Sequence, residues 1–277
     1  MTVTVPSTHP LDAPFHAAYR AAPAITGTEY GFTGIQTLQG NEVPLRFSAW
    51  LPGDKPAERL SALDAWQRER RRFRFFFPER HYAPSREAHA LFTRKHLGTQ
   101  VSLLVKVQAH PNVLLNPELR GEPLAWLGEP VLNRIPYAVW MQGPVADVRV
   151  VSSNLAGSDI RVVLLRHVAP ARQSILELSV SPELRHGSEP AVYDRIEATG
   201  TDGFLRVTGI WREAVHAPRL EVHRGAMELV QRDIRRDFAQ IYEHAAAHWN
   251  EDSRSASYAL ARAYLQTCLR IANYSAV

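Results

Sequence analysis

Hydrophobic positions recur along the chain with two periodicities, which together predict a structure of both helices and strands. Alternation of apolar and polar residues is typical of a strand buried on one face, whereas a repeat every three to four residues is typical of an amphipathic helix. Between residues 44 and 109 both styles occur in turn. This part predicts a strand at Pro44–Leu51, a helix at Pro56–Arg71, a strand at Phe73–Phe77, a loop at Pro78–Pro84, a helix from Ser85, as its N-cap, to His96, and a strand at Gln100–Ala109.

Beyond residue 130 the alternating style dominates, and the turns between its segments are short. The pattern predicts a helix at Asn133–Gln142, strands at Ala146–Ser153, Ile160–His167, Gln173–Val180, Tyr193–Thr199, Phe204–Thr208 and Leu220–His223, and closing helices at Glu228–Trp249 and Ser255–Asn273. We therefore expect an α+β fold, with a large, mostly antiparallel open sheet that carries helices on one face. The other face of such a sheet is a natural surface for oligomerisation.

Composition narrows the class of protein. The chain has 277 residues, of which 45% are hydrophobic and 22% are charged, so a buried core is expected. No apolar run reaches about 18 residues, and the first residues lack a basic start followed by an apolar segment, so we expect no membrane span and a cytoplasmic protein. One cysteine, Cys268, excludes an internal disulfide and a cysteine-rich zinc site. The net charge of +4 comes from arginines interleaved with acids, so no nucleic-acid partner is expected.

Two groups of polar residues are interpreted as structural. His244 and His248 stand four residues apart, a spacing at which two imidazoles on a helix can share zinc. No third ligand is evident in the sequence nearby, so we predict a solvated helical face and no metal site. Asp194 and Glu197 are interpreted as ordinary residues of a hairpin.

Three short motifs, in a fixed order, carry the most specific signal in the sequence. Asp-Lys-Pro at 54–56 precedes a predicted helix, Arg-His-Tyr-Ala-Pro at 80–84 precedes another, and Ile-Glu-Ala-Thr-Gly-Thr-Asp-Gly at 196–203 forms a hairpin. They resemble the Glu-Lys-Pro, Arg-Phe-x-Pro and Ile/Val-Glu-x-x-Gly-x-x-Gly segments of the Gfo/Idh/MocA oxidoreductases, the family of glucose–fructose oxidoreductase and inositol dehydrogenase. The resemblance covers roughly residues 44–277.

Members of this family bind NAD(P) in a dinucleotide-binding fold whose first turn carries Gly-x-Gly-x-x-Gly. This sequence contains no such motif, and only 53 residues precede Asp54. We therefore expect residues 1–77 to be a vestigial, truncated Rossmann remnant and residues 78–277 to be the family's C-terminal α+β domain. No cofactor is expected in this chain alone, and NAD(P) is expected only through a partner subunit.

The resemblance also implies which residues line the site. The family uses the lysine of Glu-Lys-Pro together with a histidine in an Asp-x-x-x-His type segment. Here Lys55 is retained, whereas Asn133 replaces the acid and Pro136 or Tyr137 replaces the histidine. Lys55 is thus the residual catalytic candidate, and the expected substrate-binding residues are Arg80, His81, Tyr82, Asn133, Arg134 and Tyr137.

The missing histidine and the missing glycine-rich motif predict a pseudoenzyme rather than an oxidoreductase that acts alone. We expect a non-catalytic or auxiliary subunit that pairs through its open sheet with a full-length homologue or with itself. Two alternatives stay open. The chain could be a repurposed, cofactor-independent enzyme acting on a sugar-like substrate in the old pocket, or a non-enzymatic binding or scaffold homodimer.

Overall fold

The computed structural model describes residues 28–29, 32–34, 43–46, 56–69, 73–76, 78–111, 124, 134–155, 158–186, 189–190, 192–208, 219–225, 228–233, 244 and 254–275.

A small sheet forms the first part of the structure. The small sheet has the strand order β1 (Thr28–Glu29), β2 (Phe32–Gly34), β3 (Val43–Arg46) and β4 (Phe73–Phe76). β3 and β4 are parallel and are joined through helix α2 (Pro56–Arg68), which makes a βαβ unit. The predicted strand–helix–strand order is confirmed here, and positions 47–51 of the predicted first strand lie outside the described residues.

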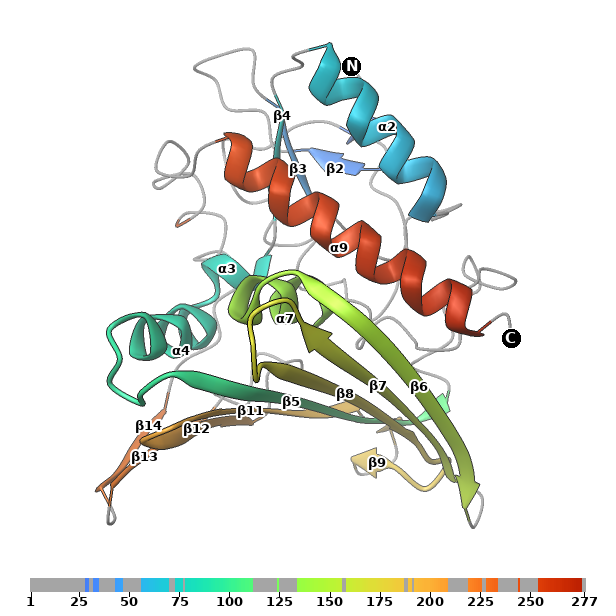
Figure 1. Cartoon of the computed structure of the whole chain (residues 1–277). Coiled ribbons are helices and arrows are strands. Elements are labelled where there is room, and N and C mark those ends of the chain that lie inside the picture. Colours follow the sequence, from blue (N-terminus) through green and yellow to red (C-terminus); the bar gives the residue numbers. More distant parts are fainter. Residues whose placement is uncertain are drawn as a thin grey trace.

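An eight-stranded sheet dominates the molecule (Figure 1). Its order is β14-β13-β12-β11-β5-β8-β7-β6, and only the β5–β8 pair is parallel. The strands are β5 (Gln100–Ala109), β6 (Val145–Leu155), β7 (Ser158–His167), β8 (Gln173–Val180), β11 (Val192–Gly200), β12 (Gly203–Thr208), β13 (Arg219–Arg224) and β14 (Glu228–Asp233). β9 (Arg185–His186) and β10 (Glu189–Pro190) form a separate ribbon. The predicted fold class, a large and mostly antiparallel open sheet in an α+β protein, is confirmed.

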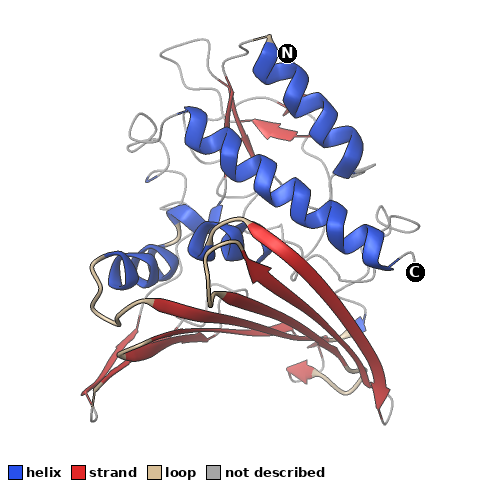
Figure 2. Cartoon of the chain, in the orientation of Figure 1, coloured by secondary structure: helices blue, strands red, loops and turns tan. Residues whose placement is uncertain are grey.

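The described helices lie on one face of the large sheet (Figure 2). Besides α2, they are α3 (Pro78–His81), α4 (Ala83–Thr93), α7 (Arg134–Gln142) and α9 (Arg254–Ser275). Helix α9 packs on α2 and β4 of the first part and also on α7 and β6, so it joins the two sheets. Within the described residues, none of the helices has both the length and the apolar character needed to cross a membrane.

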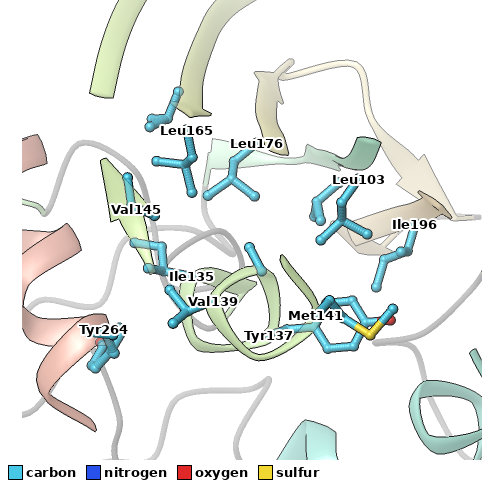
Figure 3. Packing of buried hydrophobic residues seen from close by; sticks show 14 of the residues in the cluster. Leu103, Ile135, Tyr137, Val139, Met141, Val145, Leu165, Leu176, Ile196 and Tyr264 are labelled. Atoms are coloured by element: carbon cyan, nitrogen blue, oxygen red, sulfur yellow. The ribbon is translucent and has the colours of Figure 1, made fainter. Parts of the chain in front are cut away.

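Helix α7 lies at the centre of the hydrophobic core. Its residues Ile135 and Val139 are buried among Val145, Leu165 and Leu176 of the sheet, and Tyr264 of α9 lies on the other side (Figure 3). All but one of the residues of this helix are buried, which explains why its sequence has apolar residues on every face. The helix is therefore fixed in place from two directions, and so are the polar side chains that it carries.

Three local predictions are wrong. Residues 78–81, predicted as a loop, form the short helix α3, because Pro78 occupies its first position, where a missing N–H costs nothing. Ser85 is not an N-cap: α4 begins two residues earlier, after Tyr82, and Ser85 is buried inside it. Glu228–Asp233, predicted as the start of a helix, is strand β14, because pairing with β13 overrides its helical propensity. The predicted remainder of that helix lies outside the described residues, except for His244.

Candidate functional site

Trp140 on α7 is the centre of a cluster of aromatic and basic side chains. The imidazole of His89, from α4, stacks on its indole with ring centroids 4.3 Å apart and an interplanar angle of 12°. The guanidinium carbon of Arg80, from α3, lies 5.7 Å from the centroid of the same indole. The Tyr137 ring, one helical turn before Trp140, lies 6.0 Å away and is tilted by 57°. Three helices therefore bring a cation, an imidazole and a phenol to one indole.

The protonation of His89 reflects this setting. Burial lowers the pKa of the His89 imidazole, and the positive charge of Arg80 lowers it further. A neutral imidazole stacks on an indole without bringing a second positive charge close to Arg80. It can also accept a proton or a hydrogen bond from a ligand, as a general base must.

A second polar feature is a pair of histidines, His81 and His244. The Nδ1 atoms of the two imidazoles are 3.2 Å apart, so one ring donates a hydrogen bond to the other. The ring centroids are 5.5 Å apart, the interplanar angle is 53°, and both residues are partly buried. The sequence predicted a solvated position for His244, and this prediction is wrong.

A buried ion pair holds the start of α7 against the sheet. Arg134 Nη2 donates to Asp194 Oδ2 over 2.5 Å, and both side chains are fully buried. Asp194 lies on the same face of β11 as Ile196 and Ala198, which are core residues. A carboxylate near a helix N-terminus is favoured by the helix dipole, whereas a lone cation there is not. Asp194 thus supports both Arg134 and the helix, and its interpretation as an ordinary hairpin residue is wrong.

The predicted site residues are only partly brought together. Arg80 and Tyr137 both lie beside Trp140, and the next residue along from Arg80, His81, contacts His244. Tyr82 is buried at the N-cap of α4. Arg134 is buried in its ion pair. Lys55 and Asn133 lie outside the described residues.

Sequence reasoning missed four residues of this region: Trp140, His89, Asp194 and His244. Trp140 stands three residues after Tyr137, a spacing that puts two side chains on one helical face, so it could have been found. The contact between His81 and His244 spans 163 positions and left no local signal. His89 and Asp194 are likewise placed by tertiary packing.

Comparison with known proteins supports the fold. No protein-family model matches the chain, and no curated protein does. Solved structures do match. An oxidoreductase from Agrobacterium radiobacter, in complex with NAD+, L-tartaric acid and magnesium, gives a TM-score of 0.53 at 19% identity, over 78% of this chain and 68% of that one. A dehydrogenase from Chromobacterium violaceum gives a TM-score of 0.56 at 12% identity, over 83% and 67%.

A third similar structure is KijD10, a 3-ketoreductase from Actinomadura kijaniata in complex with TDP-benzene and NADP. It gives a TM-score of 0.50 at 18% identity, over 78% of this chain and 65% of that one. The chain spans about two-thirds of the length of each of these structures. At such identities the likeness concerns the fold. The chain therefore shares its fold with these oxidoreductases.

Proposed function

We propose that this chain is an auxiliary subunit related to sugar and polyol NAD(P)-dependent oxidoreductases. It pairs through the open face of its large sheet with a full-length homologue or with a second copy of itself. It contributes the Trp140 cluster to a pocket for a sugar-like molecule, and the partner contributes the NAD(P) site. The observation that carries the proposal is the composition of the open face.

The open face is apolar at its centre. Along β7, Val163 and Leu165 point into the core, so the intervening residues point to the opposite face. Leu164 there is the direct cross-strand neighbour of Ile175, which in turn neighbours Leu104. Val162, two positions before Leu164 on β7, points to the same face. Its cross-strand neighbour on β6 is Val151, which is 55% exposed. Within the described part of the chain, no helix covers these side chains, which leaves them open to a partner.

Charged residues flank this apolar centre and neutralise one another. Arg206 contacts Glu197 over 2.6 Å and Glu221 over 3.5 Å, and Lys106 contacts Glu177 over 2.8 Å. Burying charges that are already paired costs less free energy than burying lone charges. An apolar centre with a polar surround is the usual arrangement of a protein–protein interface.

Two features of the sequence argue for a partner that holds the cofactor. The sequence has no Gly-x-Gly-x-x-Gly motif, through which the backbone of a dinucleotide fold approaches the pyrophosphate. Tyr137 is a candidate for the position of the family's catalytic histidine, and a phenolic hydroxyl is a poorer proton acceptor than an imidazole. Hydride transfer by this chain alone is therefore the least favoured function.

Light scattering on three versions of the chain tests the pairing. Val151 lies on the open face, whereas Val168, which is 64% exposed, lies in the turn after β7 and serves as a matched control. We expect the wild type and Val168→Asp to form a dimer, or a complex with a co-expressed full-length homologue, and Val151→Asp to elute as a monomer. A wild type that stays monomeric with and without the homologue would refute the proposal, as would equal assembly of the two variants.

A second candidate function is supported by the Trp140 cluster itself. His89, Tyr137 and Arg80 give one indole a base, an acid and a cation, which is enough for a cofactor-independent elimination or hydrolysis on a sugar-like substrate. In that case His89→Ala and Tyr137→Phe should each abolish turnover of oxidised sugars by the isolated chain. Unchanged rates in both variants would exclude this function.

A further inference from the structure

We propose that the ligand of the Trp140 cluster carries an oxyanion, a phosphate or a carboxylate, and that Arg86 binds it. The cluster consists of Trp140 with Arg80, His89 and Tyr137 around it. Arg86 precedes His89 by three residues on α4, so the two side chains are neighbours on one face of that helix. The inference rests on the proposed role of the cluster as a ligand site, and it names the chemical group that the site selects.

Arg86 is a partly buried cation without a counterion among the described residues. Its Nε atom is buried and has no hydrogen-bond partner there, and no described carboxylate forms an ion pair with its guanidinium. Other buried or partly buried arginines have carboxylate partners; these are Arg134, Arg161 and Arg206. Burial lowers the pKa of the Arg86 guanidinium. Because burying an unpaired charge costs free energy, a bound anion would stabilise this side chain.

The charge next to Arg86 is also positive. Burial lowers the pKa of the His89 imidazole, and so does the charge of Arg80, which lies beside Trp140. In the part of the chain that the structure describes, no carboxylate offsets these effects. The site thus has a positive potential that favours an anion.

The chemistry of the guanidinium group determines which ligands the site selects. An arginine binds a carboxylate or a phosphate through two parallel N–H···O bonds. A neutral polyol would leave the buried Nε–H of Arg86 without a charged acceptor. A site built around a buried polar group rejects ligands that cannot pair with it, so we expect anions to bind more tightly than neutral polyols.

Calorimetric titration of the full chain with inorganic phosphate, acetate and the neutral polyol sorbitol tests this selection. Salt at about 150 mM screens weak contacts with the basic surface. We expect at least one anion to bind about tenfold more tightly than sorbitol, and the tighter of the two assigns the group as phosphate or carboxylate. Sorbitol binding as tight as that of both anions would overturn the oxyanion and leave the proposed sugar-like ligand in place. Binding of none of the three would overturn both the oxyanion and the ligand site.

Two variants of α4 locate the anion. Arg86→Gln keeps N–H donors but removes the charge, so we expect it to bind the anion at least about tenfold more weakly and sorbitol as the wild type does. Arg94→Gln, which alters an exposed arginine at the C-cap of the same helix, should bind the anion as the wild type does. Wild-type affinity in Arg86→Gln, or an equal loss in both variants, would overturn the proposal.

NMR on the wild type keeps the test decisive if Arg86→Gln does not fold. The His89 imidazole can be identified by its nuclear Overhauser effect with the indole of Trp140, on which it stacks at 4.3 Å. We expect the bound anion to shift the ring signals of His89 and to leave those of His223, which stacks on Phe204 of the large sheet, unchanged. Signals that move for both histidines, or for neither, would overturn the proposal.

Discussion

At the scale of single residues, the buried ion pair between Arg134 and Asp194 connects the candidate site to the sheet. Both side chains are fully buried, 2.5 Å apart. We expect Arg134→Met to lower the free energy of unfolding by about 3–5 kcal/mol, because the Asp194 carboxylate would stay buried without its cation. Urea denaturation followed by circular dichroism measures this loss.

Two controls separate the ion pair from a general loss of packing. The double variant Arg134→Met with Asp194→Leu should recover most of the lost stability, since no uncompensated charge remains. Arg149→Met, on an exposed position of β6, should change stability by less than about 0.5 kcal/mol. If Arg134→Met were as stable as Arg149→Met, the ion pair would not hold α7 in place.

His167 gives the protein a pH-dependent stability. Its Nδ1–H donates to the Gly143 carbonyl over 2.6 Å, and its Nε2 accepts from the Ser174 hydroxyl over 2.7 Å. Burial lowers the pKa of His167 below its ordinary value of 6.5, although the hydrogen bond to Gly143 opposes the shift. Below that pH the unfolded chain therefore binds more protons than the folded one. The stabilising contribution of neutral His167 is present above pH 6.5 and is lost as the pH falls through the lowered pKa.

Thermal melts at several pH values check this expectation. Between about pH 7 and 5 the melting temperature of the wild type should fall more steeply than that of His167→Gln, although the variant is less stable at neutral pH. His96→Gln, at an exposed position, should follow the wild type. Equal slopes for the wild type and His167→Gln would show that this histidine does not titrate as expected.

At the scale of elements, the turn between α4 and β5 is locked against the hairpin between β11 and β12. Gly98 has φ +73°, and a Cβ added there would lie 2.0 Å from Thr201 Oγ1. The Asp202 amide donates to the Leu97 carbonyl over 3.2 Å. Gly98→Ala would therefore combine a strained backbone with a steric overlap. The overlap would disturb the packing of the α4–β5 turn against the β11–β12 turn.

Two other glycines provide the matched comparison. Gly143 and Gly225 also have positive φ, +89° and +58°, but nothing lies within 4 Å of an added Cβ. We expect Gly143→Ala and Gly225→Ala to cost about 1–2 kcal/mol each, from backbone strain alone. Gly98→Ala should cost about 1–3 kcal/mol more, from the overlap. Chemical denaturation measures the three, and equal losses would mean that the overlap relaxes freely.

The elements that the sequence predicted well are those whose pattern is set by burial on one face. β5 and β8 begin and end at the predicted residues, because core and open-face positions alternate along β8 and, from Leu103 onward, along β5. The helix predicted to start at Glu228–Asp233 was wrong, because the pairing of this segment with β13 is a tertiary property. The local sequence pattern also suits a helix and does not reveal that pairing. The N-cap prediction for Ser85 was wrong, because α4 begins before it, with a Pro in its first turn.

The candidate site was predictable where a motif carried it. Arg80 and Tyr137 came from segments that resemble a known family, and the structure places both beside Trp140. His244 was predicted to face solvent, because no sequence pattern connects it with His81. Contacts between distant segments are decided by packing, so this part of the site required the structure.

At the scale of the whole molecule, the large sheet has two unlike faces. One face is covered by α4, α7 and α9, and the other presents an apolar centre around Leu164 that no described helix covers (Figure 1). The candidate site lies on the helical side, where Trp140 and its neighbours gather. A subunit can therefore pair through one face and still present its site on the other, as the proposed auxiliary role requires.

The most direct measurement of this account is a calorimetric titration of NADH and NADPH. It is made on the isolated chain and on the chain co-purified with a full-length homologue. We predict no binding by the isolated chain and binding by the complex, with the cofactor held by the homologue. Micromolar binding of either cofactor by the isolated chain would contradict the auxiliary role and would make this protein an oxidoreductase with a cofactor site of its own.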